Sequence, residues 1–176
     1  MIESVDDRGF PIQFENPPQR IVSLVPSLTE TLVDLGLEEQ IVGVTRFCIH
    51  PEHLRREKTR VGGKTGIRVD LILVLKPDVV IANMEENEAQ DVMTLENAGV
   101  PCWVCDVRSV ERAFTLLSDL GRMVGKAEKG EEMEKEARTT WAEGRKICCP
   151  GRDRLAAYAV WRDPWMWAGS DAYIQS

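Results

Sequence analysis

Several features that would assign a chain quickly to a class of protein are missing from this 176-residue sequence. It contains no apolar stretch long enough to span a membrane. Residues 1–7, MIESVDD, are acidic where a secretion signal would be basic and then apolar, so the chain as written is expected to be cytoplasmic. The net charge is −7, and the basic run Arg55, Arg56, Lys58 and Arg60 is interpreted as a solvated face, which argues against a nucleic-acid binder.

A disulfide framework is also missing. The five cysteines are odd in number and irregularly spaced, which fits a reducing compartment. Cys102 and Cys105 have the C-x-x-C spacing of redox and zinc motifs, but the surrounding residues predict a strand, where positions three apart point to opposite faces. We interpret both as buried small hydrophobic residues. No nucleophile–base pair or pair of catalytic carboxylates stands out, so we predict no enzymatic activity.

The most informative stretch is residues 20–36. A short apolar run at 21–25 predicts a strand, and an amphipathic helix follows a tight polar turn and closes at Gly36. Open α/β sheets bind ligands at the carboxyl ends of their strands, where this turn lies. Pro26, Ser27 and Thr29 are therefore candidate ligand-binding residues.

Strand and helix patterns continue to alternate through residue 106. Strands are predicted at 41–44, 59–61, 78–82 and 101–104, and helices near Pro51 and at 69–75 and 88–97. Alternating Phe10, Ile12 and Phe14 predict a short hairpin before the first of these strands. Residues 1–108 are thus expected to form an α/β lobe, with a mostly parallel sheet covered by helices on both faces.

Residues 109–149 carry an apolar stripe of helical period that runs from Val110 to Trp141. It predicts one long connecting helix, with Gly125 and Gly130 marking where it could bend. A helix of about 38 residues would be roughly 57 Å long, which suits a strut between two lobes. Residues 150–176 contain a strand pattern and the start of a helix, so they are expected to begin a second, incomplete α/β lobe.

In this order, the pieces resemble the helical-backbone periplasmic binding proteins, which carry cobalamin, haem and ferric siderophores to ABC importers. The resemblance extends over roughly residues 5–176 and is closest in layout to the cobalamin-binding members. It rests on the motifs at residues 18–30, 43–51, 61–63, 69–83 and 99–101, on the long helix, and on the Trp-Ala-Gly-Ser turn at 167–170.

The resemblance implies binding without catalysis. The ligand would be a corrinoid, haem or ferric siderophore held between two lobes, with no obligatory cofactor. The membrane subunits of an ABC importer would be the partners, and the location would be periplasmic or at the cell surface if a signal has been removed. The alternative is a cytoplasmic metal- or macrocycle-binding protein, a metallochaperone or enzyme accessory, with the same fold.

Individual residues take implied roles from the cobalamin-binding members. Phe47 falls where an aromatic side chain covers one face of a corrin. Lys64 and Asn83 fall where those members carry further aromatic residues, so both positions depart from the pattern. Asp70 falls at the acidic position that docks the first lobe on the transporter.

Other residues are candidates from their chemistry alone. Cys48, His50 and His53 lie within six residues and carry groups that suit a soft or borderline metal. One hypothesis is a metal, or the axial ligation of a macrocycle, at Cys48 and His50; the alternatives are polar contacts with a ligand, or a loop with a buried cysteine and two surface histidines. Glu85 and Glu86 could hold a cation or belong to a solvated loop.

Three tryptophans, Trp161, Trp165 and Trp167, cluster in the last predicted turn. Their flat faces suit a macrocycle or an aromatic siderophore, so Trp165 and Trp167 are candidate ligand-binding residues. If they are exposed instead, they could associate with a second copy and form a homodimer.

Overall fold

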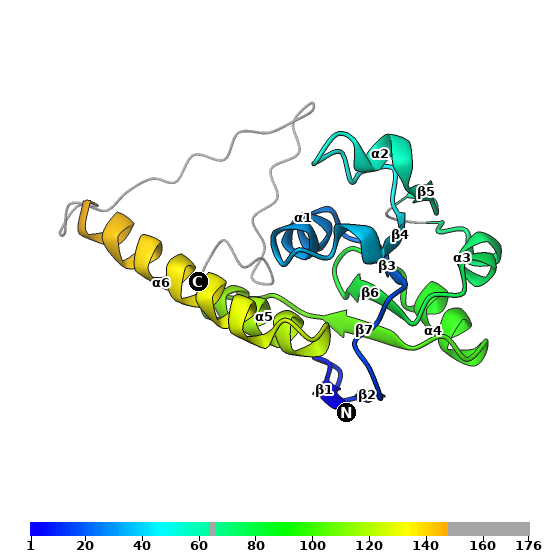
Figure 1. The fold of residues 1–176 in the computed structure, drawn as a ribbon, viewed down its shortest axis with the longest axis horizontal. Coiled ribbons are helices and arrows are strands. Elements are labelled where there is room, and N and C mark those ends of the chain that lie inside the picture. Colours follow the sequence, from blue (N-terminus) through cyan, green and yellow to red (C-terminus); the bar gives the residue numbers. More distant parts are fainter. Residues whose placement is uncertain (64–65, 148–176) are drawn as a thin grey trace.

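The computed structural model describes residues 1–63 and 66–147 (Figure 1). Its centre is a parallel sheet of five strands in the order β5-β4-β3-β6-β7. The strands are β3 (Ile21–Ser23), β4 (Ile41–Val44), β5 (Thr59–Arg60), β6 (Val79–Asn83) and β7 (Cys102–Cys105). This confirms the predicted α/β fold with a parallel sheet.

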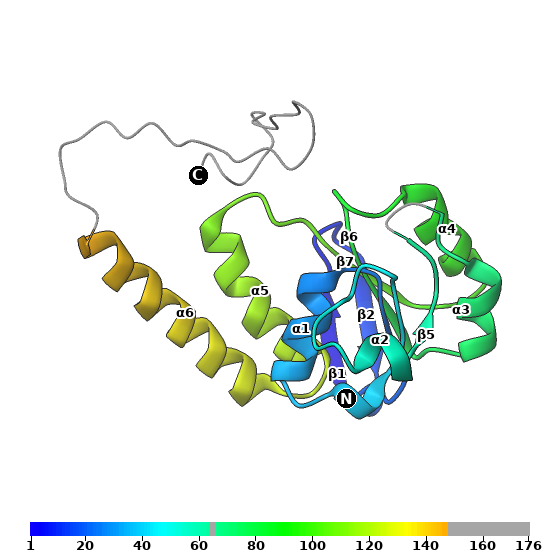
Figure 2. The same ribbon diagram turned by 90° about the horizontal axis from the view of Figure 1, so that it is seen from above.

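Helices cover both faces of the sheet, as predicted (Figure 2). On one face α1 (Pro26–Asp34) and α5 (Val110–Met123) bury their apolar stripes, and on the other face α3 (Val69–Leu75) and α4 (Ala89–Asn97) do the same. Two short elements flank β4 in sequence, the 3-10 turn η1 (Glu38–Gln40) and the one-turn helix α2 (Leu54–Glu57). The latter begins at Leu54 rather than near Pro51.

The strands form because their side chains are apolar on both sides of the sheet. All five residues of β6 are buried, the pattern of a strand covered on both faces. In β7, Cys102 belongs to the core on one face and Cys105 to the core on the other, so the two thiols diverge as predicted. Burial raises the pKa of Cys102 to about 12 and that of Cys105 to about 11, so both stay protonated at neutral pH.

The predicted amino-terminal hairpin is also present, formed by β1 (Ile2–Val5) and β2 (Pro11–Phe14). It packs beside β7 at the edge of the sheet. The Trp103 indole Nε1 donates to Ser4 Oγ at 3.2 Å, and the Asp7 backbone N–H donates to the Val104 carbonyl at 3.0 Å. The hairpin therefore covers the edge strand that would otherwise be open.

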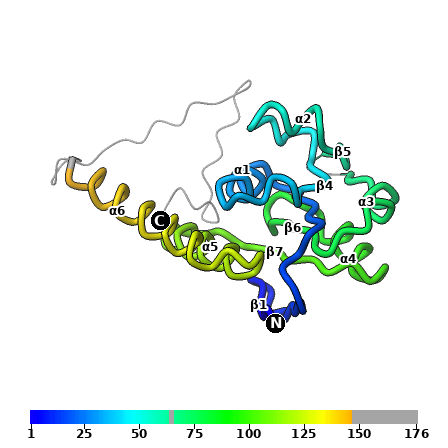
Figure 3. The backbone as a smooth tube through the Cα atoms, viewed as in Figure 1, coloured from blue at the N-terminus to red at the C-terminus, as the bar shows by residue number. Residues whose placement is uncertain are grey.

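The prediction of one long helix after residue 109 is wrong. The chain forms two helices, α5 and α6 (Ala127–Ile147), which lie antiparallel as a hairpin, and α6 extends away from the sheet (Figure 3). Gly125 has a φ of +77°, the left-handed conformation that ends a helix. A side chain at Gly125 would also meet Pro17, since a Cβ there would lie 2.7 Å from Pro17 Cγ.

A pair of glycines lets the two helices touch backbone to backbone. A Cβ on Gly130 would lie 2.7 Å from the Leu117 carbonyl oxygen and 2.9 Å from Gly121 Cα. Farther along, the Phe114 and Trp141 rings meet edge to face, with centroids 6.4 Å apart. The apolar positions of α6 thus pack back onto α5 instead of prolonging it. No helix in the described part of the chain is both long and apolar enough to cross a membrane.

Candidate ligand-binding edge

Three loops meet at the carboxyl edge of the sheet. They follow β3, β4 and β6, which are neighbours in the order β4-β3-β6. The predicted site residues Ser27, Phe47, His50 and Glu85 lie on or beside these loops, and all four are exposed. Pro26, at the first position of α1, is partly exposed. The topology therefore gathers these candidates at the edge where open α/β sheets bind ligands.

A buried polar cluster holds two of these loops together. Thr29 Oγ1 lies 2.8 Å from Ser23 Oγ and 3.2 Å from the Cys48 thiol, and Thr45 Oγ1 lies 3.3 Å from the same thiol. All four side chains are almost completely buried. Thr29 and Cys48 therefore tie the β4–α2 loop to β3 and α1, and they position the site rather than face a ligand.

The burial of Cys48 bears on the metal hypothesis. Its side chain is 0% exposed, whereas His50 is exposed. A thiol that already contacts two threonine hydroxyls inside the core cannot reach a ligand above the loop without unfolding it. The structure thus leaves His50 as the candidate axial ligand and gives Cys48 a structural role.

Large apolar side chains are exposed at the edge. Phe47 is 47% exposed and Ile49 48% exposed on the β4–α2 loop, and Met84 is 47% exposed after β6. The Arg46 guanidinium lies 4.9 Å from the centroid of the Phe47 ring. Sequence reasoning did not single out Ile49 and Met84. For Met84 the available signal was an apolar residue directly after a strand, β6, at the ligand edge.

Asn83 supports the β6–α4 loop from inside. Its Oδ1 accepts the Glu85 backbone N–H at 2.8 Å, and its Nδ2 donates to the Cys105 thiol at 3.5 Å. Its own backbone N–H donates to Asn87 Oδ1 at 2.9 Å. Asn83 is largely buried, and these bonds hold Glu85 in place, so Asn83 supports the loop that borders the site. Asn83 also lines the hollow described next, so its predicted contact with a ligand stays a prediction.

A hollow of about 480 Å³ continues from this edge over the α4 face. Met84 and Asn87 line it on the loop side, Met93 lines it on α4, and Phe10 closes it from the β1–β2 turn. Phe10 and Met93 are more than half exposed. The exposed apolar surface at the carboxyl edge therefore extends beyond the three loops, onto α4 and the β1–β2 turn.

The sequence matches the family described as "Periplasmic binding protein" over residues 21–174. The chain belongs to this family. It is 31% identical over 122 residues to the vitamin B12-binding protein of Vibrio campbellii, covering 69% of this chain and 44% of that protein. It is 28% identical over 131 residues to an uncharacterized ABC transporter substrate-binding lipoprotein, YvrC, of Bacillus subtilis, covering 73% of this chain and 41% of that protein.

Solved structures agree with this assignment. A periplasmic heme-binding protein from Pseudomonas aeruginosa superposes with a TM-score of 0.68 at 29% identity, over 73% of this chain and 46% of that one. The periplasmic vitamin B12-binding protein BtuF of Vibrio cholerae superposes with a TM-score of 0.68 at 25% identity, over 74% of this chain and 51% of that one. The chain thus spans about half the length of the relatives it matches.

Asp70, which the sequence predicts to dock on a transporter, lies in the first turn of α3. Its side chain is 71% exposed and pairs with Arg68 at 2.9 Å, and the hydrogen bond from Arg68 holds the pKa of Asp70 below its ordinary value. The carboxylate is therefore charged at neutral pH and accessible to a partner. Lys64, Trp165 and Trp167 lie outside the described residues, as does the predicted start of a second lobe.

Proposed function

We propose that the carboxyl edge of this sheet forms one wall of a binding site for a corrinoid, haem or similar metal chelate, delivered to the membrane subunits of an ABC importer. The observation that carries the proposal is the exposure of Phe47 at the edge, flanked by Ile49 and Met84. A flat, largely apolar macrocycle buries such side chains well. The vitamin B12- and heme-binding relatives support the same class of ligand.

The wall is preorganised. Thr29 and Cys48 fix the loop that carries Phe47, and Asn83 fixes the loop that carries Met84 and Glu85. A loop that is already ordered loses little conformational entropy when a ligand binds. An ordered wall of this kind suits a carrier, which binds its ligand and releases it unchanged.

His50 and Asp70 take separate roles in this proposal. The exposed imidazole of His50 is the candidate axial ligand for the central metal of the macrocycle, since imidazole suits iron and cobalt. The exposed Asp70 carboxylate, in the first turn of α3, is the candidate contact for arginines of the importer. In the whole protein, α6 rather than a single longer helix would lead toward the second wall of the site.

The test is to titrate cyanocobalamin calorimetrically, and haem by its absorption, into the wild type and into Phe47→Ala. We expect one-to-one binding of one of the two ligands, weakened about tenfold by Phe47→Ala because about 1.4 kcal/mol of aromatic contact is lost. Val74→Ala is the control, since Val74 is 74% exposed on α3, away from the loops of the edge.

Equal binding by wild type and Phe47→Ala would remove the proposed wall. Binding of neither macrocycle would contradict the ligand class. If haem binds, His50→Ala should change its absorption spectrum, whereas an unchanged spectrum would exclude His50 as the axial ligand.

A further inference from the structure

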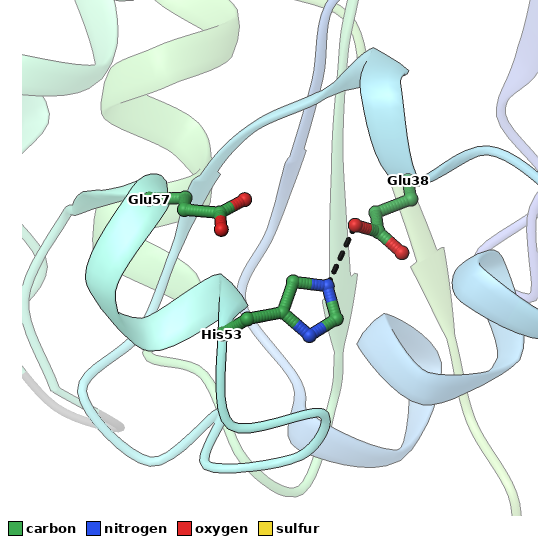
Figure 4. Close-up of side chains that lie close together, drawn as sticks. All are labelled: Glu38, His53 and Glu57. Carbon is green, nitrogen blue, oxygen red and sulfur yellow. Dashed lines mark hydrogen bonds and ion pairs between the residues drawn. The ribbon is translucent and has the colours of Figure 1, made fainter.

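Three potential metal ligands converge on the surface beside β4, although they come from two separate elements (Figure 4). Glu38 belongs to η1, the turn that enters β4, and His53 and Glu57 belong to the start and the end of α2. One ligand atom from each side chain lies within 4.8 Å of the other two. Because Glu38 lies at the amino end of β4, this cluster is separate from the ligand-binding edge.

Helical geometry places two of the three side chains together. The Glu57 backbone N–H donates to the His53 carbonyl at 3.1 Å, so the two residues are one helical turn apart. Side chains four residues apart lie on the same face of a helix and can chelate one ion. Figure 4 shows both side chains directed toward Glu38.

The backbone beneath the cluster is anchored in the core. Leu54, the residue after His53, is 0% exposed, and Leu37 and Ile41, on either side of η1, are also buried. The ligand groups themselves are exposed or partly exposed and can rotate. The cluster therefore combines a fixed spacing of the backbone with side chains that are free to adjust to an ion.

The charges at this place are unbalanced. His53 Nε2 lies 2.6 Å from Glu38 Oε1, but among the described residues neither Glu38 nor Glu57 pairs with a lysine or arginine. The nearby Arg56 pairs with Glu52 instead, at 2.6 Å. Two carboxylates thus face one imidazole, an arrangement that a cation would neutralise.

We propose that Glu38, His53 and Glu57 bind a divalent transition-metal ion of borderline softness, such as Zn²⁺. One imidazole nitrogen and two carboxylate oxygens are suitable zinc ligands at about 2.0–2.2 Å, with water completing the coordination. Two donor atoms on one tetrahedral ion lie roughly 3.3 Å apart. On binding, the distance from His53 Nε2 to Glu38 Oε1 would therefore increase from 2.6 Å, and the Glu57 carboxylate would move closer to both.

The metal replaces a proton. Because a carboxylate can only accept a hydrogen bond, Nε2 carries the proton in its contact with Glu38. When the ion binds, the proton on Nε2 is transferred by way of solvent to Nδ1, so the imidazole stays neutral and the Nε2 lone pair coordinates the metal. The bound ion links η1 to α2 and stabilises both.

The test is a calorimetric titration of Zn²⁺ into the full chain at neutral pH, compared with His53→Gln and Glu57→Gln. We expect one equivalent of zinc in the wild type, with affinity at least tenfold lower in His53→Gln and severalfold lower in Glu57→Gln. Glu52→Gln is the matched control, because it removes a neighbouring exposed glutamate outside the cluster.

Zinc bound equally well by the wild type and His53→Gln would overturn the proposal, because the ion would then be held elsewhere, for example by a cysteine. An absence of binding to the wild type would overturn it as well. All three substitutions are at exposed positions, so equal thermal unfolding without metal checks that the variants are folded.

Discussion

The sheet with its covering helices, α5 included, and the outer helix α6 are held in place by different kinds of contact. Within the sheet region, strands such as β6 are buried along their whole length, and Trp103 is 0% exposed. Along α6, the only described residue that is buried is Gly130, and the contacts with α5 are exposed ion pairs such as Glu111–Arg138 and the edge-to-face pair of Phe114 and Trp141. The first region is stabilised by the hydrophobic effect, and the second depends on the fit of two backbones.

The comparison predicts that two tryptophans differ greatly in what they contribute. Trp103→Ala should lower the free energy of unfolding by about 3–5 kcal/mol, because it leaves a large cavity in the core. Trp141→Ala, which removes a side chain 46% exposed on α6, should lower it by about 1 kcal/mol or less. Urea denaturation of both variants measures the difference, and similar losses would show that the hairpin is as tightly packed as the sheet.

Alkaline pH should weaken the sheet region. In the unfolded chain the thiols ionise from their ordinary pKa of 9.0, whereas burial raises the pKa to about 12 for Cys102 and about 11 for Cys105. The stabilisation is fully present below pH 9 and is lost as the pH rises through the folded values. Near pH 10 the ionisation of the two thiols in the unfolded chain should lower the free energy of unfolding by about 3 kcal/mol.

Urea denaturation at pH 8 and pH 10 measures this loss. Other groups also titrate in this range, so Cys102→Ala provides the control and should lose less stability between the two pH values than the wild type does. An identical loss in both proteins would show that the Cys102 thiol ionises freely in the folded state.

Two glycines on α6 should respond in opposite directions to the same substitution. Gly130→Ala places a methyl group against the backbone of α5, so one helix must move, and we expect a loss of about 1–3 kcal/mol. Gly144→Ala meets no atom within 4 Å and should gain about 0.5–1 kcal/mol from helix propensity. Circular dichroism during thermal unfolding compares the two, and a stabilising Gly130→Ala would mean that the helices are not in close contact.

The smallest effect is expected at Arg138, which pairs with Glu111 and Glu134 on the surface. Solvent screens such pairs, so Arg138→Gln should leave the unfolding temperature nearly unchanged. A marked drop, especially one that added salt reproduces in the wild type, would show that ion pairs rather than the glycine contact hold the hairpin.

Much of the sheet region could be predicted from the sequence because apolar runs and turn residues agree there with the final packing. The helix at Val69–Leu75 and the strand at Ile41–Val44 have the predicted bounds. The hairpin could not be predicted in the same way. An apolar stripe has the same pattern whether a helix continues or folds back. The left-handed turn at Gly125 and the close approach of Gly121 and Gly130 determine that it folds back here.

The candidate site was predictable in its position but not in the direction of its side chains. The order of strands and loops was enough to place Ser27, Phe47 and His50 at the carboxyl edge. It could not show that Cys48 and Asn83 point inward, because a polar side chain in a loop can satisfy the backbone as readily as a ligand. Nor could spacing reveal that His53 meets Glu38, since β4 lies between them in the sequence.

The contact of Gly125 with Pro17 ties the direction of α6 to the segment that enters the sheet. The turn that starts α6 rests on a proline that precedes β3, and α6 then packs on α5 from Gly130 to Trp141. A 21-residue helix is about 32 Å long, so this helix is held both at its first turn and along much of its inner face. It therefore projects from the sheet in one fixed direction.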